Sequence, residues 1–139
     1  MAKMSSEIKE LIETNKLAFI ATVDASGAPN VSPKSTFSII DDETFMFAEI
    51  MSTHTRENLL KNPKIAVYFL DKEKNRGCQI KGTAEMLNSG ELFDEMTEAL
   101  SYFSRKANYV VKVKVEDIFP WPPKTIAGSY QEMAGGGNK

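Results

Sequence analysis

The chain reads STHTRENLLKNP from Ser52 to Pro63. This stretch predicts a short helix, because Thr53 is a suitable N-cap residue and Pro63 disfavours helical geometry in the residue before it. The first turn of a helix has free backbone N–H groups and a partial positive charge. Further hydrogen-bond donors would come from the guanidinium of Arg56 and from the hydroxyl groups of Ser52, Thr53 and Thr55. We therefore interpret the start of this helix as a candidate phosphate cradle, although most capped helices bind nothing.

The composition excludes several classes of protein. The 139 residues fit one domain, and the net charge of −2 is spread along the chain, which argues against a nucleic-acid or membrane-surface binder. One cysteine, Cys78, and one histidine, His54, exclude an internal disulfide and argue against a thiolate or imidazole metal cage. No apolar run approaches a membrane span, and the N-terminal residues lack the apolar core of a signal peptide. We expect a cytoplasmic protein.

Apolar patterning around the 52–63 helix predicts a mainly antiparallel sheet. Short strands joined by tight turns favour this arrangement, and closure into a β-barrel would remove the exposed edges. The predicted strands are 17–23 (apolar enough to be buried on both faces), 29–40, 44–50, 64–70, 77–87 and 111–116, and the other helices are 5–15 and 90–106. We expect one domain over residues 1–130 and a flexible C-terminal tail over 131–139.

Finer signals mark two of these elements. Gly82 predicts a bulge or a close approach of two backbones inside its strand. Asn88 and Glu91 have the spacing of a capping box at the start of the 90–106 helix. An apolar stripe along that helix predicts core packing and consists of Leu92, Phe93, Met96, Leu100 and Phe103.

The chemistry-bearing motifs of most enzymes are missing from the sequence. It has no Gly-x-Gly-x-x-Gly, no Walker loop and no Gly-x-Ser-x-Gly. His54 falls in an exposed helical turn, and the lone Cys78 is expected to be a small core residue. Pro29 and Pro33 indicate an edge or bulged strand, where Lys34 among small polar residues could contact an anionic ligand or could be an ordinary surface lysine.

The order of these elements resembles the pyridoxamine 5'-phosphate oxidase-like, FMN-binding split β-barrel family, and especially its small FMN-binding proteins. The resemblance covers about residues 8–118. It includes the Asn-Leu…Asn-Pro spacing after residue 57 and the later Lys-Gly-Thr-Ala at 81–84. The segments that carry it are 17–23, 24–27, 29–35, 45–49, 53–59, 62–67 and 80–85.

The resemblance implies a homodimer that binds FMN at two sites in the subunit interface. By position, it assigns the phosphate and ribityl segment to Thr53, Thr55, Arg56 and Asn58. It assigns the strand beside the flavin to Pro33, Lys34 and Ser35, and the strand end whose backbone faces the isoalloxazine edge to Ala48, Glu49 and Ile50. No metal site is expected, and the catalytic residues stay unassigned.

These observations predict an FMN-binding flavoprotein, which we interpret as a flavin-dependent oxidoreductase or reductase of unknown substrate and electron donor. The competing interpretation is a non-enzymatic FMN carrier, electron-transfer module or sensor. A third interpretation keeps the fold and changes the ligand to a deazaflavin or haem. The absence of a second histidine argues against haem.

The C-terminal part departs from the full-length oxidases, which carry Arg and His residues there that recognise the substrate. Residues 119–125 contain neither residue type, so we expect pyridoxamine 5'-phosphate to be a poor substrate or none. Trp121, between prolines, is expected to be either a rigid flap over a flavin or the end of a surface strand.

Overall fold

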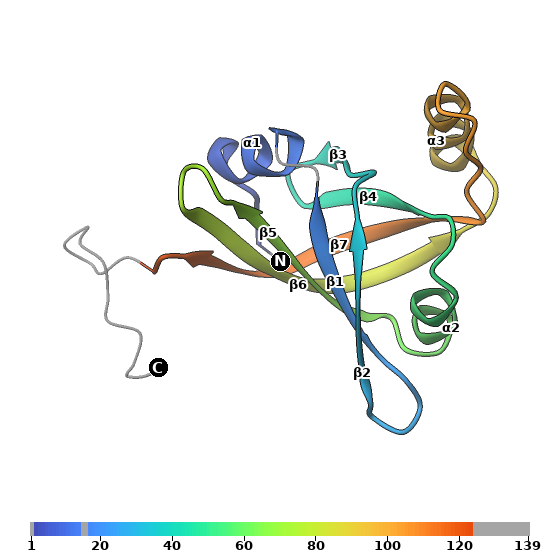
Figure 1. The fold of residues 1–139 in the computed structure, drawn as a ribbon, viewed down its shortest axis with the longest axis horizontal. Coiled ribbons are helices and arrows are strands. Elements are labelled where there is room, and N and C mark those ends of the chain that lie inside the picture. Colours follow the sequence, from blue (N-terminus) through green and yellow to red (C-terminus); the bar gives the residue numbers. More distant parts are fainter. Residues whose placement is uncertain (1, 15–16, 124–139) are drawn as a thin grey trace.

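The computed structural model describes residues 2–14 and 17–123 (Figure 1). It contains helices α1 (Ser6–Thr14), α2 (Thr53–Lys61) and α3 (Glu91–Ser101). Its strands are β1 (Ala18–Val23), β2 (Pro29–Lys34), β3 (Ser38–Asp41), β4 (Thr44–Glu49), β5 (Lys64–Asp71), β6 (Arg76–Leu87) and β7 (Tyr109–Trp121). β7 ends at Trp121, so this residue lies at a strand end, whereas the predicted tail at 131–139 lies outside the described residues.

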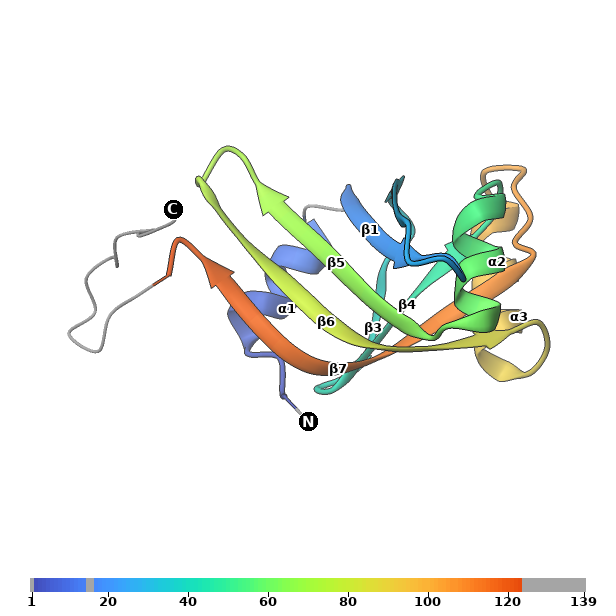
Figure 2. The same ribbon diagram turned by 90° about the horizontal axis from the view of Figure 1, so that it is seen from below.

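The strands form one antiparallel sheet in the order β2-β1-β5-β6-β7-β4-β3. This confirms the predicted mainly antiparallel architecture. The sheet curves strongly along β5, β6 and β7, with α1 near one end and α2 and α3 near the other (Figures 1 and 2). None of the helices in the described part of the chain is long and apolar enough to cross a membrane.

Aromatic side chains fill the main core inside the curved sheet. Phe37, Phe45, Phe47 and Phe69 are buried there, and the rings of Phe37 and Phe69 meet edge to face with centroids 4.9 Å apart. Leu11 of α1 belongs to the same cluster, so this helix covers part of the core. Burial of such large apolar side chains is the main favourable term in folding the barrel.

β4 is the strand that is buried on both faces. Phe45 and Phe47 point into the main core, whereas Met46 and Ala48 pack in a second cluster with residues of α3. The prediction that strand 17–23 is buried on both faces was wrong. β1 alternates instead, and Phe19 on its outer face is 45% exposed, because no described element packs over that face.

The 29–40 strand was predicted as one element and is two. Residues 35–37 leave the ladder between β2 and β3, which lie at opposite edges of the sheet. β2 pairs with β1, and β3 pairs with β4, so the chain crosses the open side of the barrel at this point. The predicted edge character of the proline-containing strand is confirmed by the position of β2.

The predicted bulge at Gly82 is confirmed. The β6–β7 register shifts between Lys81 and Gly82, and a Cβ atom at Gly82 would lie 2.3 Å from the backbone oxygen of Lys114. Glycine is therefore required here by the close approach of two strands.

The third helix differs from its prediction. α3 ends at Ser101 and not at residue 106. Its N-cap residue is Gly90, which has no side chain to form a capping bond, so the predicted capping box was wrong. Leu92, Phe93, Met96 and Leu100 pack as expected, but Phe103 lies beyond the helix and is 74% exposed. The first helix ends at Thr14, and the remaining predicted position, residue 15, lies outside the described residues.

Candidate functional site

Polar side chains join α2 to the β1–β2 hairpin. The hydroxyl oxygens of Ser32 and Thr55 are 2.9 Å apart, and Asn58 Nδ2 donates to Thr22 Oγ1 at 3.0 Å. Thr22, Thr55 and Asn58 are buried. Since buried polar groups need partners, these two contacts set the position of α2 against the hairpin.

The start of α2 is organised around Ser52. This residue is the N-cap, one position before the predicted N-cap Thr53, and its side chain makes no capping bond. Lys34 Nζ, from the end of β2, donates to Ser52 Oγ at 2.5 Å. The predicted helix end is confirmed, because Asn62 has extended backbone geometry before Pro63.

Glu49, the last residue of β4, has a completely buried side chain. Its Oε2 accepts a hydrogen bond from the Ser52 backbone N–H at 3.0 Å, and its Oε1 lies 3.5 Å from Arg56 Nη1. The Asn108 backbone N–H donates to the Glu49 carbonyl oxygen at 2.9 Å. A carboxylate therefore already faces both the N-terminal end of α2 and the guanidinium that the sequence assigned to phosphate binding.

Lys34 is the second charged group at this end of the barrel. Its half-burial lowers the pKa of the Lys34 ammonium, and the negative charge of Glu49 opposes part of that shift. The site thus keeps a partly desolvated cation close to a buried anion, which strengthens the electrostatic interactions of both groups.

A cavity of about 340 Å³ opens between β2, the end of β4 and the start of α2. The lining contains the predicted residues Pro33, Lys34, Ser35, Ala48 and Ile50, together with Ser32, Thr36, Met51, Ser52 and Arg105. The predicted residues outside the lining are Glu49, Thr53, Thr55, Arg56 and Asn58. The tertiary structure therefore brings the two predicted strand segments together around one space and places the α2 residues beside it.

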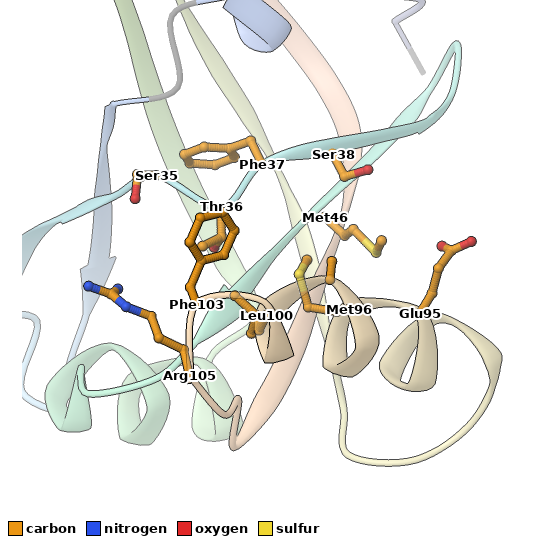
Figure 3. Close-up of a pocket in the computed structure, with 11 residues that line it drawn as sticks. Ser35, Thr36, Phe37, Ser38, Met46, Glu95, Met96, Leu100, Phe103 and Arg105 are labelled. Atoms are coloured by element: carbon orange, nitrogen blue, oxygen red, sulfur yellow. The ribbon is translucent and has the colours of Figure 1, made fainter.

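A larger cavity of about 620 Å³ adjoins the first and shares Ser35, Thr36 and Arg105 with it. Figure 3 shows segment 35–38 on one side of this cavity and α3, Phe103 and Arg105 on the other. Arg105 falls within the predicted 90–106 helix and was not among the predicted site residues. α3 ends at Ser101, and the chain beyond it places Arg105 beside both cavities.

Other potential ligand groups lie elsewhere. His54 is exposed on α2 and lines neither cavity. Cys78 is buried in the main core, and burial raises the pKa of its thiol to about 12, so it stays protonated. Among the described residues, no group of three or more His, Cys, Asp or Glu side chains could hold a metal ion.

Sequence comparison identifies the family. The family model described as pyridoxamine 5'-phosphate oxidase matches residues 4–122, which is most of the chain. The chain belongs to this family. Its curved antiparallel sheet is the split β-barrel of the family, as the sequence predicted.

Three solved structures illustrate the range of similar proteins. HupZ of Group A Streptococcus is 33% identical, with 93% of this chain and 99% of that chain covered and a TM-score of 0.79. An FMN-binding protein from Syntrophomonas wolfei is 24% identical, with 82% and 83% covered and a TM-score of 0.73. HutZ, the heme storage protein from Vibrio cholerae, is 23% identical, with 85% and 93% covered and a TM-score of 0.65. The last two similarities concern the fold, and no curated protein matches the chain.

Proposed function

We propose that this member of the family is an FMN-binding flavoprotein. The observation that carries the proposal is the 340 Å³ cavity, where Lys34, Ser52 and the end of β4 meet. Its volume falls within the range of about 300–1,000 Å³ that is typical of small-molecule sites. Its lining combines apolar atoms with a few hydrogen-bonding groups, which suits a flat aromatic ring that carries polar edges.

In this proposal the cofactor's phosphate lies at the start of α2. Ser52 supplies a hydroxyl group, and the first helical turn supplies backbone N–H groups at Thr53 and His54. Thr55 and Arg56 lie on the same turn, and Asn58 follows on the next. Pro33, Lys34 and Ser35 would run beside the flavin, with Ala48, Glu49 and Ile50 at its edge, as the sequence resemblance implies.

Bound FMN would supply the redox chemistry, which is the acceptance of a hydride or of single electrons. The protein's own contribution would be position and electrostatics, with Lys34 stabilising negative charge near the ring. The adjoining 620 Å³ cavity offers space for a substrate or donor beside the cofactor cavity. We therefore favour a flavin-dependent oxidoreductase of unknown substrate over a non-enzymatic FMN carrier, electron-transfer protein or sensor.

A homodimer is part of the proposal. The outer face of β1 and β2 exposes apolar side chains, with Phe19 45% and Val31 66% exposed. Phe19 pairs with Pro33 on one side and with Tyr68 on the other, so the apolar surface continues over three neighbouring strands. Burying such a surface against a second copy would remove apolar area from water and would bring the partner near the β2 wall of the cavity.

The absorbance spectrum of the purified protein, followed by mass identification of any ligand that denaturation releases, tests the cofactor. We expect a flavin spectrum, either as purified or after addition of FMN. A haem spectrum would favour the alternative that the HutZ similarity raises, and a released deazaflavin would keep the fold assignment while changing the cofactor. Turnover of bound FMN by reduced nicotinamide in air separates an oxidoreductase from a carrier.

A further inference from the structure

A buried carboxylate interacts with both cations of the candidate cofactor site. Glu49 has 0% of its side chain exposed and is 3.5 Å from Arg56, measured from Oε1 to Nη1. It is also close enough to Lys34 to affect that group's titration. Ala48 and Ile50, on either side of Glu49 in the chain, line the 340 Å³ cavity.

We propose that Glu49 is a specificity-determining residue, which offsets Arg56 and so limits how strongly the site prefers a phosphorylated flavin over an unphosphorylated one. The inference deepens the proposed function, because it rests on FMN or riboflavin occupying this site. It assigns a role to the Glu49 side chain, whereas the family resemblance concerns only the backbone at this position.

Charge counting supports this role. Lys34 and Arg56 contribute two positive charges near the start of α2, and Glu49 removes one of them. A phosphate monoester carries a charge of about −1.5 to −2 at neutral pH. Because buried charges are poorly screened by salt, the carboxylate would repel that phosphate and hold Arg56 by direct attraction.

The hydrogen-bond geometry supports it as well. Glu49 Oε2 accepts the Ser52 N–H, which is one of the donors at the helix start that would otherwise be free to bind a phosphate. Glu49 therefore reduces the anion affinity of the site in two ways, by charge and by occupying a donor. A neutral glutamine keeps an oxygen acceptor for Ser52 while it removes the charge.

The experiment measures the dissociation constants of FMN and riboflavin for the wild-type protein and for Glu49→Gln, by fluorescence titration. We expect the ratio of riboflavin to FMN dissociation constants to rise about tenfold in Glu49→Gln, with riboflavin affinity changed less than about threefold. Glu57→Gln is the matched control, because Glu57 is exposed on α2 and its substitution removes the same charge. It should leave the ratio within about twofold.

Equal weakening of both flavins in Glu49→Gln would mean that Glu49 only supports the local structure, and the inference would be overturned. An unchanged ratio with wild-type FMN binding intact would also overturn it while the proposed function stood. If the wild-type protein bound neither flavin and Glu49→Gln bound FMN, the inference would hold and the proposed native cofactor would be wrong. Failure of both proteins to bind FMN would overturn both proposals.

Arg56→Gln provides a second measurement that does not depend on Glu49→Gln folding. Because Arg56→Gln would leave the buried Glu49 carboxylate without its cationic partner, it should weaken FMN binding about tenfold or more and riboflavin binding less than about threefold. Similar weakening of both flavins, or an unchanged FMN affinity, would show that the Glu49 charge does not act on the phosphate and would contradict the inference. In the Glu49→Gln background the same Arg56 substitution should cost less FMN affinity, because no unpaired carboxylate then remains, which makes the two residues energetically coupled.

Discussion

Lys34 Nζ donates a hydrogen bond to Ser52 Oγ at 2.5 Å, which connects the end of β2 with the N-cap of α2. The two residues are eighteen positions apart in the chain. Their contact forms one wall of the 340 Å³ cavity, because both residues line it. Lys34 therefore connects the edge strand β2 to the start of α2.

Removal of the Lys34 charge should weaken FMN binding. A hydrogen bond to a charged group contributes about 1.5–3 kcal/mol, so Lys34→Met should raise the dissociation constant of FMN about tenfold or more. Fluorescence titration measures the effect, and Lys72→Met, in the exposed turn between β5 and β6, is the control. An FMN affinity within about twofold of the wild-type value would exclude Lys34 from the binding site.

The pH dependence of stability should also depend on Lys34. Burial lowers the pKa of Lys34 from its ordinary value of 10.5, so the unfolded chain holds this proton more tightly than the folded chain. In the window between the lowered pKa and 10.5, this residue makes the free energy of unfolding rise with pH. At lower pH the charged lysine carries the full cost of its burial.

Lys34→Met removes that cost, so the ligand-free variant should melt at a higher temperature than the wild-type protein near pH 7. The difference should become smaller as the pH approaches 10.5. Thermal unfolding of both proteins followed by circular dichroism at several pH values measures it. A difference that is constant or grows with pH would show that Lys34 burial does not govern the effect.

A charge at Phe19 should disrupt the proposed homodimer. Phe19 lies on the exposed outer face of β1, and Phe19→Glu would place a carboxylate within an apolar interface. We expect a single-chain mass by light scattering at micromolar concentration for this variant, and twice that mass for the wild-type protein. Leu60→Glu, at an exposed apolar position on α2, is the control and should remain dimeric. Dimers in both variants would place the interface elsewhere.

A methyl group at Gly82 should destabilise the barrel. Its Cβ would lie 2.3 Å from Lys114 O and 3.0 Å from Val113 Cγ1, and a backbone neighbour has little freedom to move. Gly82→Ala should therefore lower the free energy of unfolding by about 2 kcal/mol or more, measured by urea denaturation. Lys81→Ala, at the exposed neighbouring position, should change it by less than about 1 kcal/mol. Equal effects of the two substitutions would contradict the close-approach explanation.

Local chemistry in the sequence determined much of this fold. Pro63 ended α2, Gly82 marked the bulge, and alternation at Val111, Val113 and Val115 indicated a strand with one buried face. These signals depend on the backbone restrictions of proline and glycine and on the two-residue period of a strand, which act within a few residues. The resemblance to the family then predicted that elements in this order form a split barrel.

The tertiary structure decided which side chains meet. Burial of β4 on both faces depends on α3, and exposure of Phe19 depends on the absence of a described element over β1. The contact of Glu49 with Arg56 and the position of Arg105 beside both cavities could not be read from spacing. Such contacts form between segments that are distant in the chain or at the ends of elements, where local preferences leave several backbone paths of similar energy and packing selects one.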